Sequence, residues 1–229
     1  MMFEQPLVRT WGDHPEVAAS IIWLHGLGAD CHDFEPVADE LHLPVDKAVR
    51  FVFPNAPVRA VTINGGMRMR AWYDIAVSSE GFSTNPGHLK QSADYVDQLV
   101  RQQIEDGIAP SNIFVAGFSQ GGAVALYAAL RSQQILAGVI ALSTYLPLKE
   151  EFSEFGEENP RAIDIFMGHG NSDPLISIER AMTSRDLLRK IGAQVDWHEY
   201  DMQHSVCAEE LEDLSRWLIS RLQHPAVHG

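Results

Sequence analysis

The chain contains only two cysteines, Cys31 and Cys207, among its 229 residues. Two cysteines are too few for a disulfide framework, so we expect free thiols in a reducing compartment. Basic residues are also scarce, because 17 Lys and Arg stand against 31 Asp and Glu, which gives a formal charge of −14. Such a surface repels phosphate, and the basic residues form no cluster. We therefore expect no nucleic-acid partner.

Long hydrophobic runs are missing as well. The longest mostly apolar stretch begins at Val17, reaches Leu24 and then meets glycines and polar residues, so it is too short to cross a membrane. The N-terminal sequence has neither the basic start nor the apolar core of a secretory signal. These features predict a cytoplasmic protein with no integral membrane association.

The sequence does contain a regular alternation of short apolar runs and stretches with helical spacing. The apolar runs are "AASIIWLHG", "VRFVFPNAP", "NIFVAGFS", "AGVIALS", "AIDIFMGHG" and "QVDWHEY". Most of them are apolar at consecutive positions, which is typical of strands buried on both faces. The stretches between them predict helices over residues 33–43, 88–104, 120–132, 178–191 and 208–222. We therefore expect one α/β domain over residues 1–229, with a mainly parallel sheet covered by helices on both faces.

The most acidic segment, "KEEFSEFGEE" at residues 149–158, is predicted to be a solvated loop without a functional role. It lies within residues 145–161, a stretch too short to form a separate cap domain. An active site at the carboxyl ends of the strands, where parallel sheets bind ligands, is therefore expected to be open.

The tripeptide Gly-Phe-Ser occurs twice, at residues 81–83 and 117–119. Ser119 follows an apolar run, opens an Ala-rich stretch and completes the pattern G-x-S-x-G, which predicts a nucleophile on a sharp strand-to-helix turn. Ser83 follows no apolar run and has Asn85 in place of the second glycine, so we interpret it as a loop residue. The alternative for Ser119 is a tight turn with an unreactive serine, and its partners decide between the two.

A reactive serine needs a base and an acid that orients the base, and on this scaffold both follow the serine in the chain. His204 lies beyond the end of the last apolar run, whereas His198 lies inside that run and is expected on a sheet face. Asp173 directly follows the run "AIDIFMGHG". We therefore predict Ser119, His204 and Asp173 as nucleophile, base and orienting acid.

The developing oxyanion needs two backbone N–H donors. One is predicted from Gln120, the residue after the nucleophile, and the other from the glycine-rich turn "HGLG", where Leu27 lies between two glycines. Metal and nucleotide sites are not indicated, since "HEYDMQH" lacks the paired histidines of a zinc helix and "NGGMRMR" follows no phosphate-binding turn.

Together the segments "HGLGAD", "PNAPVRAVTINGGMRMRAWYDI", "GFSQGGA", "LSTYLP", "HGNSDPLI" and "HSVCAEE" resemble the phospholipase/carboxylesterase family of small α/β-hydrolases. That family includes bacterial carboxylesterases and acyl-protein thioesterases. The resemblance extends over about residues 21–222, and one departure is Gln203, where relatives often have glycine. It implies an α/β-hydrolase fold without a cap domain, the triad and oxyanion donors named above, and an acyl-binding groove near Trp72 and Leu175. It also implies that the enzyme needs no metal and no organic cofactor.

The expected activity is that of a serine carboxylesterase acting on a small acyl ester. An acyl-protein thioesterase or a lysophospholipase would use the same triad, so the residues do not separate these substrates. A non-catalytic ligand-binding member of the fold is the other alternative. A homodimer is compatible with the sequence, although no subunit interface can be identified from it.

Overall fold

The computed structural model describes residues 3–43, 48–78, 81–152, 154–155 and 162–223. Its centre is a seven-stranded sheet in the order β1-β3-β2-β8-β9-β10-β11. Neighbouring strands are parallel except for the edge pair β1–β3, which is antiparallel. The strands are β1 (Leu7–Trp11), β2 (Val17–Leu24), β3 (Ala48–Phe53), β8 (Ile113–Phe118), β9 (Gly138–Leu142), β10 (Asp164–Gly170) and β11 (Gln194–Tyr200).

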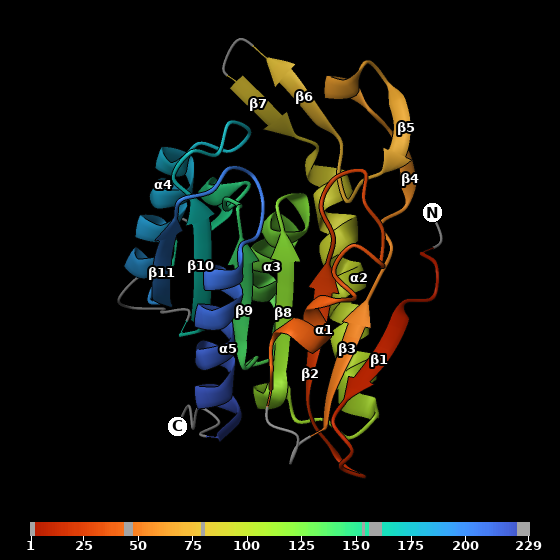
Figure 1. Cartoon of the computed structure of the whole chain (residues 1–229). Coiled ribbons are helices and arrows are strands. Elements are labelled where there is room, and N and C mark those ends of the chain that lie inside the picture. The colour runs from red at the N-terminus through yellow and green to blue at the C-terminus, as the bar shows by residue number, and fades with distance from the viewer. Residues whose placement is uncertain (1–2, 44–47, 79–80, 153, 156–161, 224–229) are drawn as a thin grey trace.

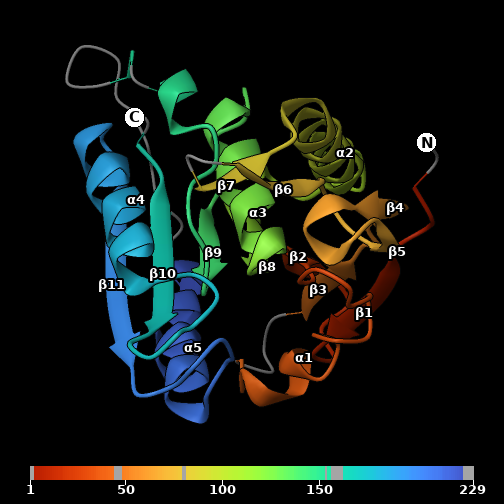
Figure 2. The ribbon, with the colours of Figure 1, turned by 90° about the horizontal axis from the view of Figure 1, so that it is seen from above.

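The six apolar runs of the sequence are the six mutually parallel strands, so the predicted strands are confirmed. The seventh strand, β1, was not predicted, because its residues alternate between half-buried and exposed and form no continuous apolar run. Helices cover both faces of this sheet (Figures 1 and 2). The predicted α/β-hydrolase class of fold is therefore confirmed.

Four long helices begin and end within two residues of their predicted positions. They are α2 (Pro86–Glu105), α3 (Gln120–Arg131), α4 (Ile178–Lys190) and α5 (Ala208–Gln223). Figure 2 shows α2, α3 and α4 on one face of the sheet and α1 with α5 on the other. Each face has its own apolar core, and Leu126 and Leu218 are fully buried in the first and second of these cores. The sheet is therefore shielded from water on both sides.

The helix predicted over residues 33–43 is wrong in extent. The structure has only the short α1 (Val37–Glu40), preceded by turns. Pro36 has no N–H to continue a helix from the preceding residues, and His42 adopts a φ of 45°, which ends the helix.

Two antiparallel hairpins rise beyond the carboxyl ends of the parallel strands (Figure 1). The first pairs β4 (Val58–Val61) with β5 (Met67–Arg70), and the second pairs β6 (Ile75–Ser78) with β7 (Gly81–Thr84). Ser83 therefore lies in a strand, opposite Ala76, and not in the predicted loop. The sequence signal was missed because each of these strands spans only four residues.

The acidic segment at residues 149–158 is partly outside the described residues. Its first part is the short helix η3 (Lys149–Phe152), in which Phe152 is buried. Glu151 accepts a hydrogen bond of 2.6 Å from the Tyr127 hydroxyl and pairs with Lys90 at 3.1 Å, so this part is anchored to α2 and α3 rather than freely solvated. Among the described helices, none combines the length and apolar character that a membrane crossing needs.

Candidate active site

Ser119 lies on the turn between β8 and α3, at the carboxyl end of a central strand. Its backbone has φ 54° and ψ −117°, a conformation that is costly for a residue with a side chain. The Ser119 N–H donates to the Leu142 carbonyl at 2.9 Å, and the Thr144 hydroxyl donates to the Ser119 carbonyl at 2.7 Å. The strained turn is therefore held by hydrogen bonds to β9 and the residues that follow it.

The two glycines of the G-x-S-x-G pattern allow this turn to pack against its neighbours. A Cβ atom on Gly121 would lie 2.3 Å from the Leu24 carbonyl oxygen, and one on Gly117 would lie 2.3 Å from the backbone of Gly121. Both distances are far below a van der Waals contact, and in each case the obstacle is main chain. The pattern thus reflects close backbone packing around Ser119, as its sequence predicts.

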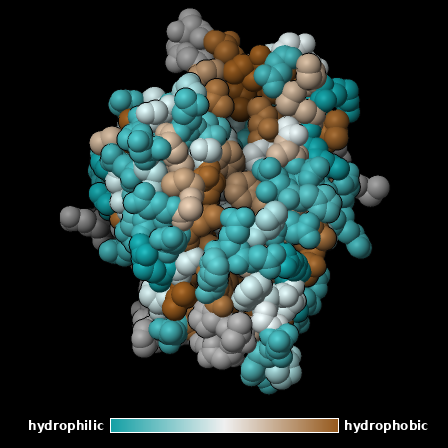
Figure 3. Space-filling view, in the orientation of Figure 1, coloured by the Kyte–Doolittle hydropathy of each residue, from teal (hydrophilic) through white to brown (hydrophobic). Residues whose placement is uncertain are grey.

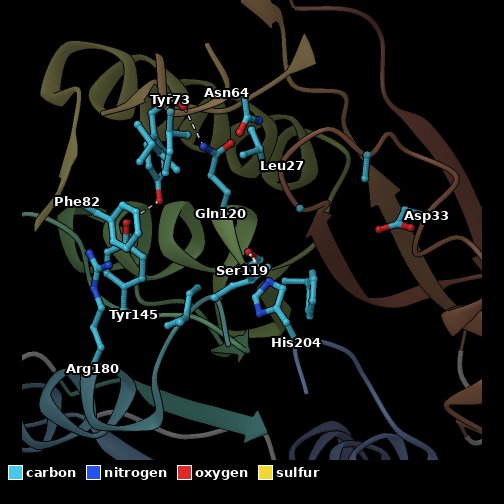
Figure 4. Close-up of a pocket in the computed structure, with 17 residues that line it drawn as sticks. Leu27, Asp33, Asn64, Tyr73, Phe82, Ser119, Gln120, Tyr145, Arg180 and His204 are labelled. Carbon is cyan, nitrogen blue, oxygen red and sulfur yellow. Dashed lines mark hydrogen bonds between the residues drawn. The ribbon is translucent and has the colours of Figure 1, made fainter. Parts of the chain in front are cut away.

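The three residues predicted as nucleophile, base and acid form one continuous hydrogen-bonded chain. His204 Nε2 lies 2.9 Å from the Ser119 hydroxyl oxygen, and His204 Nδ1 lies 2.6 Å from Asp173 Oδ2. The three side chains come from the turns after β8, β11 and β10. Figure 4 shows the His204 ring directed toward Ser119. The structure therefore brings these residues together although up to 85 positions separate them in the chain.

Asp173 is placed to remain ionised. Burial alone would raise its pKa, but hydrogen bonds from His204 and from the backbone N–H groups of Ile176 and Leu175 outweigh burial and hold the pKa of Asp173 below its usual value. An ionised carboxylate can only accept hydrogen bonds, so the proton shared with His204 belongs to Nδ1. The unprotonated Nε2 then faces the serine hydroxyl as an acceptor.

Gln203, in the loop that carries His204, is exposed. Its backbone packs tightly against the end of β10, where a Cβ atom on Gly170 would lie 2.3 Å from the Gln203 carbonyl oxygen. The ring of Phe118 lies against the imidazole, with centroids 4.8 Å apart. The imidazole is thus positioned by Asp173 on one edge and by an aromatic face beside it.

A cavity of about 490 Å³ opens next to Ser119. Its lining includes Ser119, His204, both predicted oxyanion donors Leu27 and Gln120, and the mouth residue Leu175, which is 64% exposed. Other lining residues come from the two hairpins, namely Ile63, Asn64, Ile75 and Phe82. In the space-filling view, apolar side chains gather over β6 and β7 and along a hollow on the same face (Figure 3). The site is therefore open but walled by the hairpins.

The structure corrects the prediction for Trp72. Its side chain is fully buried and does not line the cavity, because the indole N–H points inward and donates to the His25 carbonyl at 2.8 Å. The adjacent Tyr73 lines the cavity instead. The Gln120 side chain clamps this segment, since its oxygen accepts from the Trp72 N–H at 2.7 Å and its amide donates to the Tyr73 carbonyl at 2.8 Å.

His25 is a supporting residue that the sequence did not single out. Its Nδ1 lies 2.7 Å from the Gly26 carbonyl, and its Nε2 accepts the Ala56 N–H at 3.0 Å, which requires the neutral ring. Burial lowers the pKa of His25 and keeps it neutral. The ring thereby joins the turn that contains Leu27 to the segment after β3. Its position directly before "GLG" is the signal that could have revealed it.

Two other histidines, His169 in β10 and His198 in β11, pack against neighbouring residues of the fold. His198 lies on a face of β11 as predicted, where it stacks on Phe166 at 4.9 Å. His169 is buried behind the site, and its Nε2 lies 2.8 Å from the Ile176 carbonyl. In the described part of the chain, no three His, Cys, Asp or Glu side chains are grouped as metal ligands.

The chain matches the family model described as phospholipase/carboxylesterase over residues 11–221. It is 37% identical over 218 residues to acyl-protein thioesterase 1 of Neurospora crassa, covering 89% of this chain and 87% of the relative. It is 34% identical to acyl-protein thioesterase 1 of Cryptococcus neoformans, with coverage of 90% and 93%. Among solved structures, Arabidopsis thaliana SOBER1 has a TM-score of 0.81 and 28% identity, over 90% of this chain and 100% of that chain. Zea mays acyl-protein thioesterase 2 has a TM-score of 0.80 and 25% identity, over 94% and 99%.

Proposed function

Because the chain belongs to the phospholipase/carboxylesterase family and is a hydrolase of carboxylic esters or thioesters, we propose that it cleaves acyl esters through an acyl-enzyme on Ser119. His204 is the general base and Asp173 orients it. The observation that supports this most strongly is the chain of short hydrogen bonds from Asp173 through His204 to the Ser119 hydroxyl. Three loops that are distant in the sequence converge there, and the arrangement is the one expected of a nucleophile, a general base and an orienting acid.

In the first half of the reaction, His204 Nε2 accepts the Ser119 proton while the serine oxygen bonds to the substrate carbonyl carbon. Asp173 stabilises the imidazolium that forms, because its carboxylate already accepts a hydrogen bond from the Nδ1–H group. The tetrahedral intermediate then collapses. The bond to the alcohol or thiol breaks, His204 gives that group its proton, and the acyl group stays on Ser119.

The negative charge on the intermediate needs donors that are in place beforehand. We assign this role to the backbone N–H groups of Gln120 and Leu27. Gln120 is the first residue of α3, where amide groups are free and the helix dipole is positive. The side-chain clamp of Gln120 on the Trp72–Tyr73 segment and the His25 bridge keep both donors fixed relative to Ser119.

In the second half, water replaces the alcohol. His204 accepts a proton from this water as its oxygen bonds to the acyl carbon, and the same proton returns to Ser119 when the acid leaves. The reaction therefore consumes one water and restores the enzyme without any further reactant.

A thioesterase acting on acylated proteins, or a lysophospholipase, is the second candidate. The thioesterase is favoured by the relatives, which are named acyl-protein thioesterase 1. The open cavity with an apolar mouth around Leu175 and Phe82 is compatible with a long acyl chain as well as a short one.

A matched substrate panel separates these candidates. The purified protein is assayed with pairs of esters and thioesters that carry the same acyl group, in a series from acetyl to palmitoyl. Highest kcat/KM on short-chain esters supports the carboxylesterase, and highest kcat/KM on long-chain thioesters supports the thioesterase. Highest kcat/KM on long-chain oxygen esters supports the lysophospholipase. Failure to cleave any member of the panel would contradict both.

A further inference from the structure

Arg180 projects into the cavity from the first turn of α4, seven residues after Asp173. Its guanidinium lies over the Tyr145 ring, with Cζ 3.5 Å from the ring centroid. Figure 4 shows this pair at one end of the cavity, beside Phe82 and on the far side of Ser119 from Asp33. Stacking on an aromatic face leaves the edge of the guanidinium, with its N–H donors, free for another group.

Arg180 differs from most other arginines of the molecule, because it has no acidic partner among the described residues. Carboxylates pair with seven of the others, namely Arg9, Arg50, Arg70, Arg131, Arg185, Arg216 and Arg221. Arg180 does not stabilise α4 either, since a positive charge near a helix N-terminus opposes the helix dipole. Neither ion pairing nor helix stability therefore explains why this side chain lies in the wall of the cavity.

Three hydroxyl groups extend the polar character of this end. The Tyr145 hydroxyl lies 3.3 Å from that of Tyr73 and 3.5 Å from the hydroxyl of Thr84. Burial, together with the neighbouring Tyr145, raises the pKa of Tyr73 well above its usual value, so Tyr73 stays neutral and its hydroxyl can donate a hydrogen bond. The end of the cavity thus combines a fixed positive charge with hydroxyl groups.

The opposite end of the cavity has the reverse charge. Asp33 lines it there. Elsewhere in the cavity, Ile75, Phe82 and Leu175 contribute apolar surface. A bound anion is attracted to Arg180 and repelled by Asp33, so the cavity accepts an anionic group in one orientation. The chain as a whole has a net charge of −14, so a positively charged end of the cavity contrasts with the rest of the molecule. Binding a neutral substrate would not require this positive charge.

We propose that the Arg180–Tyr145–Tyr73 end of the cavity is a recognition subsite for a carboxylate carried by the ester substrate. The carboxylate accepts two hydrogen bonds from the guanidinium edge while the ester carbonyl lies at Ser119. Because the guanidinium is already held on the Tyr145 ring, little of its freedom is lost on binding. The proposal deepens the function given above and rests on it, and the carboxylate can belong to the acyl group or to the alcohol.

The test compares esters that differ only in carboxylate against carboxamide, which has nearly the same shape and no charge. One pair places the group on the acyl side, as the mono-p-nitrophenyl ester of adipic acid and its terminal amide. The other places it on the leaving group, as the hexanoyl esters of p-hydroxybenzoate and p-hydroxybenzamide. The readout is the ratio of kcat/KM within a pair, so any general loss of activity in a variant cancels.

Arg180→Gln removes the charge, Arg180→Lys keeps it without the planar fork, and Arg185→Gln is the matched control. Arg185 is on the same helix, but it stacks on Trp197 and pairs with Asp186 outside the cavity. In at least one pair the wild-type protein is expected to favour the carboxylate by about tenfold or more, the range for a hydrogen bond to a charged group. Arg180→Gln loses this preference, Arg180→Lys regains part of it and Arg185→Gln retains it. The pair that responds identifies the side that carries the carboxylate.

Equal ratios in wild type and Arg180→Gln would overturn the subsite while leaving the esterase proposal intact. Binding of free adipate, measured by calorimetry against its diamide, provides a readout without turnover. Adipate is expected to bind the wild-type protein more tightly than the diamide does, and Arg180→Gln is expected to remove the difference. Equal binding of both compounds to wild type would count against the subsite even if no ester were cleaved.

Discussion

The two Gly-Phe-Ser segments have the same three residues and opposite surroundings. In the β6–β7 hairpin, Ser83 is exposed and its hydroxyl donates to the Ala76 carbonyl at 3.4 Å. At the end of β8, Ser119 has a strained backbone and its hydroxyl lies 2.9 Å from His204. The phenylalanines differ in the same way, since Phe118 packs on the His204 ring and Phe82 is 52% exposed. The tripeptide therefore becomes a site only where a strand, a helix and two other loops meet.

The largest expected difference between the segments is in turnover. Ser119→Ala should lower kcat by about 10⁴-fold or more, because no other group can form the acyl-enzyme. Ser83→Ala changes an exposed hairpin hydroxyl and should alter kcat by less than about twofold. Steady-state hydrolysis of a short p-nitrophenyl ester measures both. A comparable loss in the two variants would remove the distinction.

Alanine in place of a glycine near each Gly-Phe-Ser segment should affect the stability of the protein differently. A Cβ atom on Gly121 meets fixed backbone at 2.3 Å, so Gly121→Ala is expected to lower the free energy of unfolding by about 3 kcal/mol or more. Gly87, which follows the hairpin in the first turn of α2, has only the Asn85 side chain at 3.5 Å. Gly87→Ala should be neutral or stabilise the helix by about 0.5 kcal/mol. Urea unfolding compares them, and equal stabilities would argue against the close packing of the elbow.

A smaller difference is expected on acidification. The pKa of Asp173 is lowered, so its ionised form stabilises the folded state above the ordinary carboxyl value of 3.8, and this stabilisation is lost as the pH falls through the lowered pKa. Asp173→Asn should flatten that acid decline. Asp74 at the base of the hairpin is held in the same direction by Thr62 but is more exposed, so Asp74→Asn should have the same sign and a smaller effect. Unfolding measured between about pH 2 and pH 6 tests this order.

The sequence predicted which residues converge at the candidate active site better than it predicted which residues line the cavity. Buried parallel strands are legible as continuous apolar runs, and polar residues directly after them, such as Ser119 and Asp173, must share one edge of the sheet. Which of two adjacent aromatics faces a cavity is not encoded locally. The choice between Trp72 and Tyr73 depends on the Gln120 clamp and the His25 carbonyl, which are distant in the chain. The predicted helix over residues 33–43 failed because one proline outweighed its apolar spacing.

Arg180 illustrates the same limit. In the sequence it is one of several basic residues on a predicted helix, and nothing local separates it from Arg185. Only the packing of α4 beside the loop with Tyr145 directs one arginine into the cavity and leaves the other paired with Asp186. Substrate specificity is therefore harder to predict from the sequence than the catalytic residues, because it depends on how helices and loops pack against one another.

Fluorophosphonate labelling of the folded protein, followed by peptide mapping, tests the central claim most directly, because the probe reacts only with a serine whose proton is removed by a neighbouring base. We expect one adduct per chain on Ser119, none on Ser83, and loss of the adduct in His204→Ala. A folded protein that remains unlabelled, or an adduct on any other serine, would contradict the account and favour a non-catalytic binding protein or a different site.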